Sequence, residues 1–197
     1  GGIPVFLQAG RNRYGVIGPI HPDVLAPAAI AKAIAANPLA RKAKSQRAVY
    51  SVVTNCTYDG MCYDAKGAQD LLGQSVDRIH FDEAWYGYAR FNPMYRDRYA
   101  MRGEPASHDD DGPTVFATHS THKLLAALSQ SSFIHVRDGR GAIGHHHFNQ
   151  AYMMHTTTSP LYAIVASNDI AAAMMDGGGG QSLTQEVIQE AVDFRQT

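Results

Sequence analysis

The stretch Thr114-Val-Phe-Ala-Thr-His-Ser-Thr-His-Lys-Leu-Leu-Ala-Ala-Leu-Ser-Gln130 decides the fold and raises the first functional hypothesis. Its apolar residues 115–117 predict a buried strand, and the polar run 118–123 follows directly and ends on Lys123. Burial at a strand end disfavours the charged form of a lysine, and a Schiff-base lysine needs such an environment. The alternative is a lysine that begins a helix and reaches solvent.

Strand-like segments alternate with helix-like segments along most of the chain. The expected strands are the apolar runs at residues 3–7, 48–54, 77–81, 114–117 and 132–136. The expected helices between them cover residues 28–36, after Pro27, and residues 65–72, before Gly73. This alternation predicts an α/β fold with a mainly parallel sheet and flanking helices.

A long aromatic and charged segment, residues 85–113, shows no clear period. A segment of this kind inside a domain indicates a functional or irregular loop. Its acidic run at residues 108–111 is expected to be a solvated loop rather than a metal site.

The last part of the chain favours helices. Residues 151–175 are expected to be mostly helical with a break at Ser159-Pro160, and the glycines 177–180 predict a flexible joint. Ser182 and Gln185 resemble a capping box that begins a last helix. The predicted organisation is therefore a main domain over residues 1–176, followed over 177–197 by a joint and the start of a helix.

Composition limits the class of protein. With 197 residues, 45% of them hydrophobic and 18% charged, the chain is long enough for one globular domain with a sizeable core. A formal net charge of -1 gives no reason to expect nucleic acid or a membrane surface as a partner. Cys56 and Cys62 are too few for a disulfide scaffold. Without a membrane span or signal-peptide pattern, the sequence predicts a cytoplasmic protein.

Two local patterns resemble sites but are better explained otherwise. Gly139-x-Gly141-x-x-Gly144 fits the dinucleotide-binding pattern, yet it leads into His145-His-His147 rather than an apolar helix. Neighbouring residues of an extended chain point to alternate sides, so the three histidines are expected in a surface loop and not around one metal ion. No metal site is predicted.

Four segments together resemble a known family. Ser120-Thr-His122-Lys123 resembles the Ser-x-His-Lys motif of the pyridoxal-phosphate-dependent ornithine/lysine/arginine decarboxylases, and His80-Phe-Asp-Glu-Ala-Trp-Tyr-Gly87 resembles their strand-end Asp-x-Ala motif. Residues 53–60 and 157–162 resemble two further family segments, in the family's order. Residues 81–103 are most similar to the biodegradative, acid-inducible arginine decarboxylases. The resemblance implies the large cofactor-binding domain of the fold-type I, aspartate aminotransferase-like enzymes.

The resemblance also implies a catalytic set. Lys123 would form the imine with pyridoxal phosphate and could return the proton to the substrate Cα. Asp82 would hold the pyridine nitrogen protonated, although a lone strand-end aspartate more often caps a turn. Ser120 and His122 match the pair that contacts the phosphate, and their alternative is ordinary strand-end hydrogen bonding.

Other residues are assigned supporting roles by the same resemblance. Ala84 would leave room for the cofactor ring, and Trp85 would form a pocket wall. Thr57 and Tyr58 are weaker pocket-lining candidates. Ser159, with its neighbour Thr158, resembles a segment that approaches the cofactor phosphate of the neighbouring subunit, which implies a homodimer with a shared active site. The alternative for Ser159 is a helix cap beside Pro160.

The implied reaction is decarboxylation of a basic amino acid, most simply L-arginine to agmatine and CO2 with one proton consumed, as suits acid resistance. Lysine or ornithine is the alternative substrate, and transamination or a non-catalytic fragment are alternative roles. Glu83 and Asp109-Asp110-Asp111 are acidic candidates for a guanidinium pocket. Because the family's enzymes are much longer and supply a phosphate loop and a ring-stacking histidine upstream, residues 1–176 are expected to be the central part of the cofactor domain.

Overall fold

The structure, a computed structural model, describes residues 2–107 and 111–196. Its centre is a four-stranded sheet with the order β1-β2-β3-β4. The strands are β1 (Ser51–Thr54), β2 (Arg78–Asp82), β3 (Thr114–His119) and β4 (Phe133–Arg137). Strands β1, β2 and β3 run parallel, and β4 pairs antiparallel with β3. The prediction of an α/β fold with a mainly parallel sheet is confirmed.

The carboxyl ends of the three parallel strands are level with one another. Thr54 lies opposite Asp82, and Asp82 lies opposite Thr118. The ladder continues one residue further, because the Asn55 N–H donates to the Asp82 carbonyl at 2.8 Å and the Glu83 N–H donates to the Thr118 carbonyl at 3.0 Å. The residues that follow these strands are therefore held side by side.

The reversal at β4 accompanies the lack of a full crossover helix between β3 and β4. A parallel return needs a crossover of about a dozen residues or more, usually with a full helix. The chain between β3 and β4 forms one short helix, α4 (Thr121–Leu124), and is otherwise irregular. It therefore turns back beside β3 and leaves β4 at the edge of the sheet.

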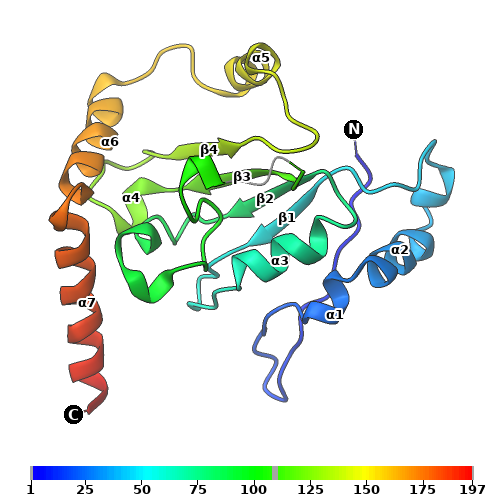
Figure 1. The fold of residues 1–197 in the computed structure, drawn as a ribbon, viewed down its shortest axis with the longest axis horizontal. Coiled ribbons are helices and arrows are strands. Elements are labelled where there is room, and N and C mark those ends of the chain that lie inside the picture. Colours follow the sequence, from blue (N-terminus) through cyan, green and yellow to red (C-terminus); the bar gives the residue numbers. More distant parts are fainter. Residues whose placement is uncertain (1, 108–110, 197) are drawn as a thin grey trace.

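The remaining helices surround the sheet, as Figure 1 shows. Helix α3 (Ala65–Leu72) packs on the sheet. Helices α1 (Pro22–Leu25) and α2 (Pro27–Ala36) lie on the side of the molecule where β1 and β2 begin. Helices α6 (Tyr162–Met175) and α7 (Gly178–Gln196) lie on the side toward which β1 and β2 point, and α5 (His145–His155) stands apart near β4. The described residues also form the 3-10 turns η1 (Ala40–Lys42), η2 (Ala89–Phe91), η3 (Pro93–Tyr95) and η4 (Pro105–Ser107).

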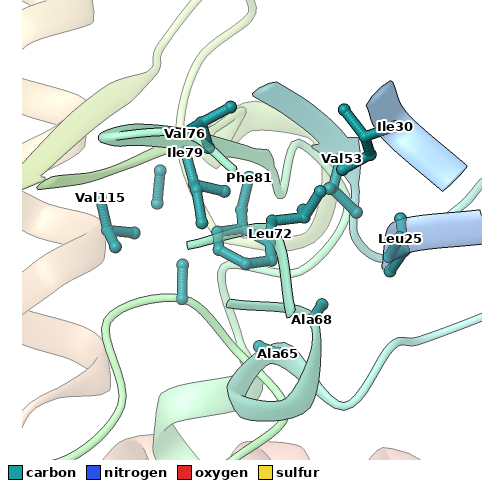
Figure 2. Packing of buried hydrophobic residues seen from close by; sticks show 12 residues of the cluster. Leu25, Ile30, Val53, Ala65, Ala68, Leu72, Val76, Ile79, Phe81 and Val115 are labelled. Atoms are coloured by element: carbon teal, nitrogen blue, oxygen red, sulfur yellow. The ribbon is translucent and has the colours of Figure 1, made fainter. Parts of the chain in front are cut away.

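The hydrophobic core fills the space between the sheet and α3 (Figure 2). On β2, Ile79 and Phe81 are fully buried and face this core, together with Leu72 of α3 and Val115 of β3. Because side chains alternate along a strand, His80 and Asp82 project from the opposite face of β2. This alternation places the core on one face and polar side chains on the other.

The expected strand at residues 3–7 is wrong. This run forms no strand, and the Phe6 side chain is 79% exposed. A short apolar run becomes a strand where it has a partner for its backbone groups, and no ladder to this run exists within residues 2–107 and 111–196.

The expected joint at residues 177–180 is shorter than predicted, because α7 begins at Gly178 and only the turn at Asp176 and Gly177 separates it from α6. Packing explains why glycines lie in this helix: a Cβ on Gly180 would lie 2.8 Å from the Phe91 ring and 2.5 Å from the Met175 carbonyl oxygen. Glycine is therefore favoured at this position of the helix, because its backbone lies too close to Phe91 for a larger residue. Ser182 lies inside α7, so it does not cap the helix as predicted.

The three adjacent histidines form the first turn of α5, not the predicted loop, and their side chains are exposed. Among the described residues, no group of three or more His, Cys, Asp or Glu side chains could hold a metal ion. Residues 139–144 follow the antiparallel strand β4, so they do not form the strand-to-helix turn of a parallel unit that dinucleotide binding requires. The irregular character of residues 85–107 and 111–113 is as expected, and most of the acidic run, residues 108–110, lies outside the described part.

None of the described helices combines the length and the apolar composition that a membrane span requires.

Phe81 provides a test of the core. We expect Phe81→Ala to lower the free energy of unfolding by about 3–5 kcal/mol, because the ring is fully buried between the sheet and α3. Phe6→Ala is the matched control, and it should change stability by less than about 0.5 kcal/mol because this ring is exposed. Urea unfolding followed by circular dichroism measures both, and equal losses would contradict the described core.

Candidate active site

Asp82 is the last residue of β2 and is half-buried. One of its carboxylate oxygens, Oδ1, accepts a hydrogen bond from the Ala84 N–H at 3.2 Å. This is the turn-capping contact that a strand-end aspartate often makes. It occupies one of the two carboxylate oxygens and fixes the direction in which the carboxylate points.

Lys123 lies on α4, directly beyond the end of β3. Its side chain is exposed in the first turn of a helix, so the buried placement is wrong and the alternative, a lysine that begins a helix and reaches solvent, is confirmed. Its Nζ atom lies 4.6 Å from the centre of the Trp85 ring, and the Tyr58 ring meets Trp85 edge-on with centroids 5.4 Å apart. A cation over an aromatic ring at an exposed site is stabilised by about 0.5–1 kcal/mol. The amine is thus positioned by Trp85 but not held tightly.

The start of α4 carries the hydroxyl and the imidazole of the sequence motif. Ser120 is the N-cap residue, and its side chain makes no capping hydrogen bond. His122 donates through Nδ1 to the Ser131 carbonyl oxygen at 2.8 Å. With Nδ1 carrying a hydrogen, Nε2 accepts in the neutral ring and donates in the protonated ring. His122 can therefore donate to an anion through Nε2 when it is protonated.

Helix α4 is anchored from the other side by α6. The Thr121 hydroxyl donates to the Asn168 Oδ1 atom at 2.5 Å, and Thr121 is buried. This contact sets the orientation of the single turn that carries His122 and Lys123. It explains why Lys123 projects outward over Trp85.

Ser159 lies apart from this set. It is exposed in the segment between α5 and α6, where its N–H donates to the Thr157 hydroxyl at 3.1 Å. The structure thus gathers most of the predicted residues at the carboxyl edge of β2 and β3: Asp82, Ala84, Trp85, Ser120, His122 and Lys123. The assignment of Ser159 to a neighbouring subunit's site stays a prediction.

Glu83, which the sequence offered as a candidate for a guanidinium pocket, lies at the same edge in a different role. Glu83 is fully buried, and its Oε1 atom accepts from Asn55 Nδ2 at 2.8 Å and from the Ala100 N–H at 2.7 Å. Its Oε2 atom lies 3.1 Å from His119 Nε2. Because both carboxylate oxygens bind the protein itself, Glu83 is not exposed to a substrate guanidinium, as had been considered.

The imidazoles on this part of the sheet are held in distinct environments. His80 bonds the Tyr50 hydroxyl through Nδ1 at 2.7 Å and the Thr118 hydroxyl through Nε2 at 3.0 Å. Burial lowers the pKa of His80, and the charge of Asp82 opposes that shift. Burial and the neighbouring His119 lower the pKa of His135 to about 4. His80 and His135 are therefore neutral near pH 7.

A carboxylate, a hydroxyl, an imidazole and a primary amine lie together where the parallel strands end. This is the edge of the sheet at which α/β domains bind their ligands. The sequence matches the family described as Orn/Lys/Arg decarboxylase, major domain, over residues 1–197. The chain belongs to this family, as its motifs predicted.

Individual relatives agree with this assignment. The chain is 67% identical over 196 residues to the biodegradative arginine decarboxylase of Escherichia coli (strain K12), covering 100% of this chain and 26% of that protein. It is 51% identical to the lysine decarboxylase LdcA of Pseudomonas aeruginosa, covering 99% of this chain and 26% of the relative. The chain thus spans about a quarter of the length of these relatives.

Solved structures share the fold. Lysine decarboxylase A from Pseudomonas aeruginosa superposes with a TM-score of 0.89 at 50% identity, covering 98% of this chain and 25% of that one. The constitutive lysine decarboxylase of E. coli gives a TM-score of 0.83 at 40% identity, with 98% and 25% covered. The predicted fold class is confirmed.

Cys56 and Cys62 form a further pair near the site. Both are free thiols, and they flank a turn closed by the hydrogen bond from the Thr57 N–H to the Met61 carbonyl at 2.9 Å. The hydrogen bond between the two thiols lowers the pKa of Cys62 to about 6 and, with burial, raises the pKa of Cys56. Cys62 is thus the more reactive thiol.

Alkylation tests this pair. We expect the rate of Cys62 modification by iodoacetamide, measured by peptide mass spectrometry, to rise with pH around a midpoint near 6. Cys56→Ala removes the hydrogen bond, so the midpoint should move up toward the ordinary thiol value of about 8.5. A wild-type midpoint already near that ordinary value would contradict the pairing.

Proposed function

We propose that the protein carrying this segment is a pyridoxal-phosphate-dependent decarboxylase that converts L-arginine to agmatine and CO2. The observation that carries the proposal is the exposed Lys123 amine over Trp85, at the sheet edge that also holds Asp82. Arginine is favoured as the substrate because the chain is 67% identical to a biodegradative arginine decarboxylase. Each turnover exchanges a carboxylate for a proton at Cα, and this proton consumption would support acid resistance.

The donor set suits pyridoxal phosphate. The cofactor needs an amine for its aldehyde, an acid for its pyridine nitrogen and hydrogen-bond donors for its phosphate. Lys123 supplies an exposed amine, Asp82 has one carboxylate oxygen outside its turn contact, and the Ser120 hydroxyl makes no capping bond. His122 is already oriented by Ser131. These residues would hold the cofactor.

The roles of the side chains follow from their chemistry. When bound, pyridoxal phosphate supplies a ring that accepts the electron pair left by the departing carboxylate. Asp82 would keep the ring nitrogen protonated, and burial lowers the pKa of its neighbour on the same face of β2, His80. Lys123 would hold the cofactor before substrate arrives and then carry the proton that returns to the substrate Cα.

The phosphate would be bound by Ser120 and by His122, because these are the donors at the start of α4. Ser159 lies on an exposed segment, where a neighbouring subunit could be reached. We therefore propose a homodimer with a shared active site, and higher oligomers remain compatible with it. The two free thiols support a cytoplasmic location, because cysteines in that compartment are kept reduced.

Lysine or ornithine is the second candidate substrate. The same segment is 51% identical to a lysine decarboxylase and 34% identical over 171 residues to an inducible ornithine decarboxylase of E. coli. A non-catalytic role is the other alternative for the isolated segment, since it spans about a quarter of these relatives.

Substrate choice is tested with the full-length protein and added cofactor. We expect CO2 release from arginine to exceed release from lysine and ornithine, and Lys123→Ala to abolish it because no other amine is placed over Trp85 in the described part of the chain. Lys66→Ala, which removes an exposed helix ion pair, is the control and should retain activity. Turnover by Lys123→Ala would reject the assignment of this lysine.

Asp82 is tested separately by comparing turnover with cofactor affinity. We expect Asp82→Ala to reduce kcat by about 10³-fold or more, because the ring nitrogen would lose its charged partner, and to weaken cofactor binding far less. Asp82→Asn keeps the shape and the contact to Ala84 but lacks the charge, so it should be similarly slow. Normal turnover in Asp82→Asn would show that the charge has no catalytic role.

A further inference from the structure

Glu83 is a buried charged side chain that has no part in the chemistry proposed above. It is fully buried, and it lies between Asp82 and Ala84 in the chain. A buried carboxylate costs several kcal/mol of desolvation unless hydrogen bonds and opposite charge compensate it. Its retention next to the candidate site therefore needs a physical explanation.

The contacts of Glu83 cross the ends of all three parallel strands. Asn55, which directly follows β1, donates to Oε1 at 2.8 Å, and His119, the last residue of β3, lies 3.1 Å from Oε2. The Ala100 N–H, from the segment after β2, donates to Oε1 at 2.7 Å. One carboxylate thus connects β1, β2, β3 and the long connecting segment.

One partner, His119, leads directly to the candidate site, and another, Asn55, is itself held firmly. His119 precedes Ser120, the N-cap of the turn that carries Lys123. Asn55 also donates to the Arg98 carbonyl at 3.0 Å and accepts from the Tyr63 N–H at 2.9 Å, so it is rigidly held. A shift of Glu83 would therefore move Asp82 on one strand relative to Lys123 beyond the next.

We propose that Glu83 is a positioning residue of the pyridoxal-phosphate site, whose carboxylate ties the ends of β1, β2 and β3 together and keeps Asp82 aligned with Lys123. This inference rests on the proposed function. His119 is its partner on β3. Without the Glu83 carboxylate, the Ala100 N–H loses its acceptor, the Asn55 amide keeps only the Arg98 carbonyl, and the end of β3 loses its side-chain link to β2.

The test uses the full-length protein with Glu83→Ala, Glu83→Gln and, as a control, Asn92→Ala. Asn92 is buried and donates to Thr184 of α7 at 3.3 Å, so its loss also removes a buried polar contact but away from the strand ends. Three quantities are measured: the melting temperature of the cofactor-free protein, the Kd for pyridoxal phosphate by equilibrium dialysis, and kcat with KM for arginine.

We expect Glu83→Ala to weaken cofactor binding by about tenfold or more and to reduce kcat by about 10²-fold, because small misplacements of reacting groups have effects of that size. Glu83→Gln keeps an oxygen for Asn55 and Ala100, so it should recover cofactor binding to within about threefold of wild type. Asn92→Ala should lower the melting temperature without changing the cofactor Kd.

Each outcome decides the question. Glu83→Ala with Kd and kcat within twofold of wild type overturns the inference, and so does an equal loss in Asn92→Ala. If Glu83→Ala does not fold, His119→Asn serves instead: a large kcat loss with an unchanged melting temperature supports the inference, and unchanged kcat overturns it. A wild-type protein that binds no pyridoxal phosphate overturns the proposed function itself, and with it the site that Glu83 would position.

Discussion

The candidate site depends on the level alignment of three parallel strand ends. Backbone hydrogen bonds carry the ladder past β1 and β2, from the Asn55 N–H to the Asp82 carbonyl and from the Glu83 N–H to the Thr118 carbonyl. The Glu83 carboxylate then connects the same three ends through side chains. Since each strand contributes one end, the residues after them reach a common edge although they are far apart in the sequence.

This edge combines a rigid part and an accessible part. The rigid part is buried and fully hydrogen-bonded, with Glu83 and Asn55 both at 0% exposure. The accessible part is the turn α4, where Lys123 is exposed over Trp85. Such a division suits a covalent cofactor site, because the amine has to reach its ligand while the groups around it keep their places.

The sequence was sufficient to predict the strand-end placement of Asp82 and Lys123. Buried apolar runs that stop at polar residues locate strand ends, and parallel ends meet at one edge. It left open whether Lys123 is buried or exposed, because the orientation of α4 depends on the contact between Thr121 and Asn168, 47 residues apart. The role of Glu83 was missed for the same reason, since its bond to Asn55 joins residues 28 positions apart.

Helices and strands were misjudged where packing overrides local preference. Gly180 lies inside α7 because its missing side chain allows close contact with Phe91, which no local pattern indicates. The apolar residues 3–7 predict a strand, but a strand forms only where a second strand pairs with it. The sequence of one segment does not show whether such a partner exists.

The most direct test of the account is to find which lysine binds the cofactor covalently. The full-length protein would be incubated with pyridoxal phosphate, reduced with borohydride, digested and mapped by mass spectrometry. The account predicts that the reduced cofactor is attached to Lys123. It also predicts that a competing amine, added before reduction, prevents this attachment. Attachment to another lysine would contradict the account, and so would cofactor that can still be removed from the protein after reduction.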